Sequence, residues 1–156
     1  GETTTSQQHN WILFRYAEIL LNYAEAMVNA YGDPDYTGSY SLSARDAVNQ
    51  VRNRGDVKMP AYPADMSKDA FLKRLKNERR VEFAFEGQRF WDLRRWKELD
   101  DMQNIYKVKV VKQTDGTIQY TKALHATYNI QDKMYFYPIS NTELFKNHKL
   151  VQNTGW

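Results

Sequence analysis

The chain has 156 residues, of which 42% are hydrophobic, a proportion that supports a packed core and excludes a disordered tail. Its 22 basic and 19 acidic residues give a formal net charge of +3 and are intermixed along the sequence, unlike the continuous basic face of a nucleic-acid-binding protein. The absence of cysteine excludes disulfides and cysteine-based zinc sites, and no apolar run is long enough to span a membrane.

Residues 11–31 have the pattern of a helix that is apolar on most of its surface. The polar residues recur every three or four positions and form one narrow stripe: Arg15, Glu18, Asn22, Glu25 and Asn29. A helix of this kind must be covered on most sides, so we expect an inner helix of a layered array. Gly32 stands at the position of a C-terminal cap, and Pro34 prevents continuation of the helix.

A second helix is predicted to begin at Ser43, because Asp46 follows three residues later and completes a capping-box pattern. Its apolar stripe consists of Ala44, Ala47, Val48 and Val51. The pattern ends at Arg54 and Gly55. The connection to the first helix is short, which predicts an antiparallel helical hairpin.

A second pair of helices is predicted after the linker marked by Pro60 and Pro63. The third helix begins after Ser67 and runs to Phe85, Gly87 interrupts the pattern, and the fourth helix covers 88–97. Two successive helical hairpins of this kind resemble tetratricopeptide repeats.

The pattern changes after residue 101 from helical periodicity to alternation. Ile105–Lys112 alternates as a strand does, Asp115 and Gly116 form a hairpin turn, and residues 117–121 supply the return strand. Lys133–Ile139 is predicted to be a short further strand, limited to an edge or an end by Pro138. The tail from Thr142 is predicted to be one helical turn followed by irregular chain.

These elements predict a mostly α fold of tetratricopeptide-like helical hairpins with a small β-hairpin and an irregular C-terminal segment. We expect one domain over residues 1–156. Its helical part covers about 11–99, and the β-hairpin and C-terminal segment cover about 102–156.

The glutamates in and just after the third helix are candidate catalytic groups. Glu78, Glu82 and Glu86 lie four residues apart on one helix face. Glycoside hydrolysis needs two carboxylates that face each other across a sugar, and these are stacked along one helix. We therefore predict that they form ion pairs with arginines that join neighbouring helices, and we predict no catalytic residue.

Metal and cofactor sites are not predicted. Residues 33–38 have the spacing of the start of a calcium loop, but Ala44 stands where the closing acidic ligand should be, so we expect a capped loop. His9, His125 and His148 are scattered without the spacing of metal ligands, and the sequence has no glycine-rich phosphate loop.

Loop aromatics are the best candidates for ligand contact, because a scaffold positions loop side chains at the surface. Tyr36, Tyr40 and Tyr62 are the predicted ligand-binding residues on this ground. Trp91 and Trp96 could form a sugar platform, but their helical spacing is more typical of core residues.

Three segments together resemble the SusD/RagB family. They are RYAEILLNYAEA from Arg15, VRNR from Val51 with NERRVEFAFEGQRFWDLRRW from Asn77, and YPI from Tyr137 with EL at 143–144 and the closing LVQNTGW. Their order and spacing are similar to the last third of that family. Ser140, His148 and Thr154 stand where the family often has proline.

The resemblance implies a C-terminal fragment of a larger SusD-like protein, because full members are about three times longer. Full members begin with a lipoprotein signal and an acylated cysteine, which lie outside this chain. They are placed on the outward face of the outer membrane and contact the membrane only through that lipid anchor. The resemblance also implies that the principal sugar contacts come mainly from the portion missing here, so no complete ligand site is expected.

The resemblance further implies partnership with a SusC-like TonB-dependent transporter and non-catalytic binding of a glycan or other polymeric nutrient for uptake. On this reading the chain is not an enzyme. The alternative is a free-standing tetratricopeptide-type adaptor that binds a protein or peptide.

Overall fold

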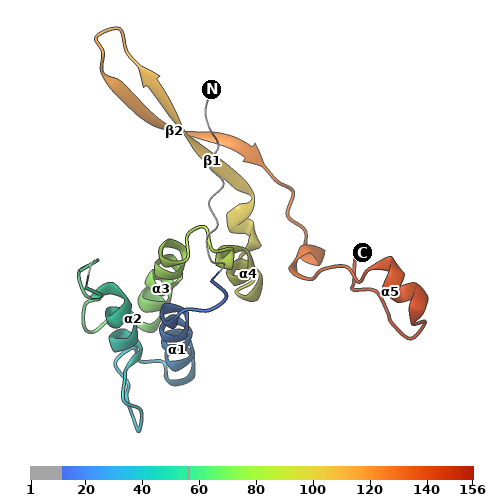
Figure 1. The fold of residues 1–156 in the computed structure, drawn as a ribbon, viewed down its shortest axis with the longest axis horizontal. Helices are drawn as coiled ribbons and strands as arrows, with labels where there is room; N and C mark the ends of the chain where they lie inside the picture. Colours follow the sequence, from blue (N-terminus) through green and yellow to red (C-terminus); the bar gives the residue numbers. More distant parts are fainter. Residues whose placement is uncertain (1–11, 56) are drawn as a thin grey trace. The chain divides into compact units, whose positions relative to one another are not determined.

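The computed structural model describes residues 12–55 and 57–156, and the chain divides into two compact units, Gly1–Glu82 and Phe83–Trp156. The first unit contains three helices, α1 (Tyr16–Tyr31), α2 (Ala44–Arg52) and α3 (Lys68–Glu82) (Figure 1). The second unit contains α4 (Gln88–Arg95), η1 (Leu99–Met102), β1 (Asn104–Lys112), β2 (Ile118–Thr127), η2 (Asp132–Tyr135) and α5 (Asn141–Lys146). The predicted mostly α fold with a small β-hairpin and an irregular C-terminal segment is confirmed. No helix of the described residues is both long and apolar enough to cross a membrane.

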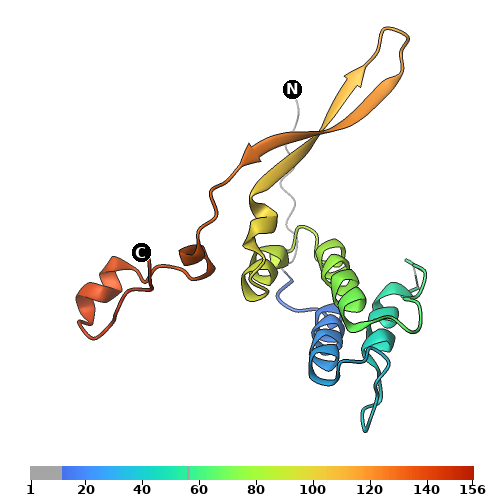
Figure 2. The same ribbon diagram turned by 180° about the vertical axis from the view of Figure 1, so that it is seen from behind.

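The three helices of the first unit lie side by side and enclose its core (Figures 1 and 2). α1 is central, because it contacts both α2 and α3. The small side chains of Ala44 and Ala47 on α2 allow close approach. The fully buried large side chains of this unit are Leu21, Val28, Val48, Phe71 and Leu75. The predicted antiparallel pairing of the first two helices is confirmed. The prediction that α1 is covered on most sides is wrong: its buried residues lie on one face, and Tyr16 and Ile19 are 67% and 55% exposed.

α1 begins later than the sequence predicts. The predicted start, Trp11, lies outside the described residues, and the chain remains extended through Arg15, with φ −144° and ψ 155°. The apolar residues just before it, Ile12, Leu13 and Phe14, are 62–78% exposed and have no core to cover them. The predicted stop is confirmed. Gly32 adopts φ 77°, and its N–H donates to the carbonyl of Val28 at 2.9 Å.

The predicted capping box at the start of α2 is confirmed: the Asp46 N–H donates to Ser43 Oγ at 3.0 Å, and the Ser43 N–H donates to Asp46 Oδ2 at 3.2 Å. Replacing Ser43 with alanine is expected to lower the free energy of unfolding by about 1 kcal/mol, measured by urea denaturation. Glycine at the same position should cost only a few tenths of a kcal/mol and is the control. Equal stability of the alanine variant and the wild type would contradict this role.

Two helices end earlier than predicted because a residue with positive φ stops each pattern. α3 ends at Glu82 rather than Phe85, and Phe85 itself has φ 66°. α4 ends at Arg95 rather than Lys97, where φ is 57°. Apolar periodicity continued across both ends and so gave no sign of the break.

The β-hairpin of the second unit is longer than predicted. β1 pairs antiparallel with β2, and the return strand extends to Thr127 rather than to residue 121. The predicted turn is confirmed: Gly116 has φ 86°, and Asp115 Oδ1 accepts from the N–H of Thr117 at 2.9 Å and from its hydroxyl at 2.7 Å. These two hydrogen bonds lower the pKa of Asp115.

The predicted strand at Lys133–Ile139 is wrong. Residues 132–135 form the short helix η2, and the extended chain after it pairs with a side chain instead of a strand. The N–H of Ile139 donates to the Gln152 side-chain oxygen at 2.8 Å, and the Gln152 side-chain nitrogen donates back to its carbonyl at 2.9 Å. One carboxamide thus satisfies the backbone groups that a neighbouring strand would take.

Candidate functional site

Three tyrosines gather at the loop between α1 and α2, and we call Tyr31, Tyr36 and Tyr40 the tyrosine cluster. The rings of Tyr31 and Tyr36 stack with centroids 4.2 Å apart and an interplanar angle of 23°. The Tyr40 ring lies 6.0 Å from the Tyr31 ring, and their hydroxyls are 3.1 Å apart. All three side chains are exposed, at 38–47% of their surface. The structure therefore brings two of the predicted ligand residues together and adds Tyr31, the last residue of α1.

The loop that carries the tyrosine cluster is tied to both helices. Asp35 forms an ion pair with Arg45 of α2, and the Arg45 N–H donates to the carbonyl of Pro34 at 3.0 Å. On the other side, the Tyr23 hydroxyl of α1 donates to the carbonyl of Leu42 at 2.6 Å. Because Asp35 is held by Arg45, this segment is the capped loop that the sequence predicted. In residues 12–55 and 57–156, no group of three or more acidic or histidine side chains is arranged to hold a metal ion.

Gly38 is needed for the shape of the tyrosine cluster. It has φ 53°, and a Cβ atom at this position would lie 2.5 Å from the Tyr36 hydroxyl oxygen. A larger residue would therefore displace the Tyr36 ring from its stack with Tyr31.

The hydrogen bond to Tyr40 raises the pKa of Tyr31, so the Tyr31 hydroxyl is neutral at physiological pH. The cluster offers aromatic faces and neutral hydroxyls, which suit an uncharged ligand.

Tyr62 is not a surface residue, which corrects the sequence-based prediction. Only 5% of it is exposed, and its ring packs edge-on against Phe71 with centroids 5.7 Å apart. Its hydroxyl donates to Glu78 at 3.3 Å, and burial together with the Glu78 charge raises its pKa. Its loop position suggested exposure, but the Tyr62 N–H donates to the Asn49 side chain at 2.8 Å and holds the loop against α2.

Two acidic side chains of α3 form ion pairs with arginines at the start of α1 and at the end of α2. Arg15 Nη1 lies 2.5 Å from Glu82 Oε1, Arg54 pairs with the same carboxylate, and Arg52 pairs with Glu78. The predicted ion pairs are confirmed for these two glutamates. Burial acts to raise the pKa of Glu82, but hydrogen bonds from Arg54 and Arg15 outweigh it and lower the pKa. Glu82 is therefore charged at neutral pH and unsuited to act as a general acid.

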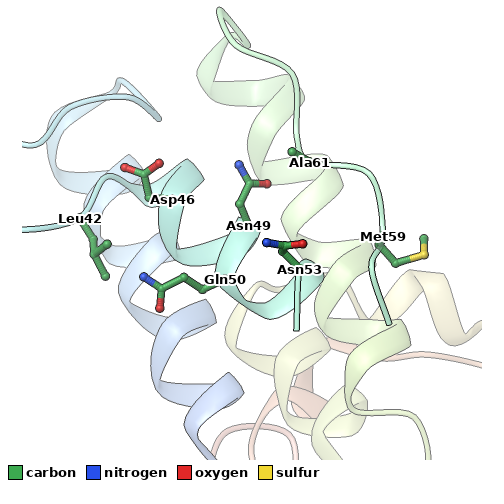
Figure 3. Close-up of a pocket in the computed structure, with 7 residues that line it drawn as sticks. All are labelled: Leu42, Asp46, Asn49, Gln50, Asn53, Met59 and Ala61. Carbon is green, nitrogen blue, oxygen red and sulfur yellow. The ribbon is translucent and has the colours of Figure 1, made fainter. Parts of the chain in front are cut away.

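A groove of about 570 Å³ runs along the outer face of α2 (Figure 3). It is lined by Leu42, Asp46, Asn49, Gln50, Asn53, Met59 and Ala61. The sequence gives no sign of this groove, because its far wall comes from the segment after α2, whose position depends on tertiary contacts. A smaller cavity of about 420 Å³ lies in the second unit and is lined by Asp132, Lys133, Phe136, Asn153, Thr154 and Gly155.

Comparison with known proteins assigns the chain to a family. The model of the SusD family matches residues 1–156. SusD-like protein P38 of Formosa agariphila is 37% identical over 90 residues, which cover 54% of this chain and 16% of that protein. SusD-like protein P2 of the same organism is 31% identical over 102 residues, which cover 62% of this chain and 19% of that protein.

A crystal structure of a SusD-like protein from Bacteroides fragilis NCTC 9343 has the same fold over nearly the whole chain. The two structures superpose with a TM-score of 0.76 at 33% sequence identity. The matched region covers 94% of this chain and 26% of the Bacteroides fragilis chain. This chain therefore spans about a quarter of that structure and less than a fifth of the two curated relatives that it matches. SusD-like proteins are generally nutrient-binding proteins of the outer membrane. The chain belongs to the SusD family.

Proposed function

We propose that this chain contributes to non-catalytic capture of a glycan nutrient at the outward face of the outer membrane. It would do so as the C-terminal part of a longer surface lipoprotein that passes the glycan to a SusC-like TonB-dependent transporter. The observation that carries the proposal is the match to the SusD family over residues 1–156. The ion pairs of Glu78 and Glu82 fit a structural role for these two carboxylates, because each pairs with an arginine from outside α3.

Within this function, the tyrosine cluster is the proposed point of glycan contact in the first unit. Aromatic faces pack against the C–H faces of sugar rings, and phenol hydroxyls reach the sugar hydroxyls. The stack of Tyr31 and Tyr36 is already present without a ligand, and the Asp35–Arg45 ion pair connects the loop to α2. A pre-formed surface loses less conformational entropy on binding.

Replacing Tyr36 and Tyr40 together with alanine is expected to weaken glycan binding about tenfold, because two exposed aromatic contacts are lost. The measurement is affinity electrophoresis followed by calorimetry with soluble starch, laminarin, xyloglucan and mannan. Tyr128→Ala is the matched control, because Tyr128 is 55% exposed and lies in the second unit. Unchanged binding in the double variant would remove the cluster from the site. Failure of the wild-type chain to bind any of these glycans would count against the proposed function itself.

A further inference from the structure

The groove on α2 has walls that are held in place by the fold. The inner face of α2 is buried through Ala47, Val48 and Val51, and rotation of the helix about its axis would expose these residues to solvent. The opposite wall, residues 59–61, is fastened to the end of α2. The Met59 N–H donates to the Arg52 carbonyl at 2.9 Å, and Arg52 Nε donates to the Pro60 carbonyl at 2.7 Å. Both walls of the groove are therefore positioned by contacts within the first unit.

The helix wall of the groove is a continuous row of polar side chains. Asp46, Asn49, Gln50 and Asn53 follow one another at helical spacing along the outer face of α2 (Figure 3). The oxygen of the Asn49 carboxamide accepts from the Tyr62 N–H at 2.8 Å, so its nitrogen remains as a donor. Within the described residues, the side chains of Gln50 and Asn53 form no hydrogen bond. Three carboxamides are therefore available along one row.

The charge of the lining indicates a neutral ligand. No lysine or arginine lines the groove, and its one carboxylate, Asp46, accepts hydrogen bonds from the N–H and hydroxyl of Ser43. An anionic ligand would meet this carboxylate without a compensating cation. A carboxamide both donates and accepts, which matches pairs of neighbouring hydroxyl groups on one ring. Leu42 and Met59 add apolar surface for C–H groups.

We propose that this groove is a binding subsite for one or two units of a neutral, polyhydroxylated sugar chain. The volume of about 570 Å³ lies within the range of small-molecule sites in proteins. An extended peptide fits less well, because it would need apolar pockets for alternate side chains, and the apolar lining consists of Leu42, Met59 and Ala61. The proposal rests on the glycan-capture function proposed above and assigns it a second point of contact.

The test is NMR spectroscopy of the ¹⁵N-labelled chain titrated with maltohexaose, laminarihexaose and mannohexaose. The side-chain NH₂ signals of Asn49, Gln50 and Asn53 are expected to shift with at least one of these neutral sugars. Replacing Gln50 and Asn53 together with alanine is expected to weaken binding of that sugar about tenfold by calorimetry, because neutral hydrogen bonds are lost at an exposed site. Asn77→Ala is the matched control, an exposed carboxamide on α3 outside the groove.

The outcomes separate this inference from the proposed function. If a neutral sugar binds but the three NH₂ signals stay in place and the Gln50/Asn53 variant binds normally, the subsite is disproved and glycan capture stands. If none of the three sugars nor any glycan in the affinity gels binds the wild-type chain, both proposals fail. Shifts of the same signals with tetra-alanine or with an oligogalacturonate, and not with neutral sugars, would reassign the groove to peptides or to acidic glycans and disprove the inference.

Discussion

Replacing Phe71 with alanine is expected to lower the free energy of unfolding by about 3–5 kcal/mol, the usual cost of removing a buried aromatic ring. Phe71 is 0% exposed and is the largest fully buried side chain of the described residues. Its ring also supports Tyr62, whose centroid lies 5.7 Å away, so the cavity would border a second aromatic residue. Urea denaturation followed by far-ultraviolet circular dichroism measures the change.

Phe14→Ala is the control for this experiment. Phe14 is 78% exposed in the same unit, so its removal should change the free energy of unfolding by no more than about 0.5 kcal/mol. Equal unfolding midpoints for Phe71→Ala and the wild type would mean that α3 does not pack against the rest of the first unit.

Replacing Glu82 with glutamine is expected to lower the free energy of unfolding by roughly 2 kcal/mol at neutral pH. Glu82 is the shared partner of Arg15 and Arg54, and its side chain is only 10% exposed. Breaking a buried pair costs about 3–5 kcal/mol, but Arg54 is 43% exposed and solvent lessens the loss. Urea denaturation at neutral pH measures the change, and glutamine keeps the shape of the side chain.

The difference between wild type and Glu82→Gln should also depend on pH. The folded pKa of Glu82 is lowered from its ordinary value of 4.5, so its contribution is fully present above that value. It should be lost as the pH falls through the folded pKa. Glu143→Gln is the control, because the Glu143–Lys146 pair is exposed and worth little. A constant difference between wild type and Glu82→Gln from pH 7 to pH 3 would contradict this role.

Features that depend on a few adjacent residues could be predicted from the sequence. The capping box of Ser43 and Asp46, the stop at Gly32 and the turn at Gly116 each follow from the chemistry of one or two residues. The ring stack of Tyr31 and Tyr36 could only be anticipated as a loop with aromatics, because its geometry also needs Gly38.

Features that depend on distant contacts could not be predicted. The burial of Tyr62 follows from its contacts with Phe71 and Asn49, and no local pattern distinguishes it from Tyr36. The sequence predicted ion pairs between neighbouring helices, but it did not show which arginines would pair with Glu78 and Glu82, because these partners lie 26 to 67 residues away in the chain. The error at residues 133–139 has the same cause, because the local sequence does not reveal that the Gln152 side chain takes the strand partner's place.

Non-catalytic capture requires that the protein binds a glycan and leaves it intact. The chain is incubated with each glycan that it retains in affinity gels, binding is measured by calorimetry, and the recovered polymer is assayed for length and for reducing ends. The expected result is saturable binding with unchanged polymer length and no new reducing ends. New reducing ends that appear only with the protein would contradict non-catalytic capture.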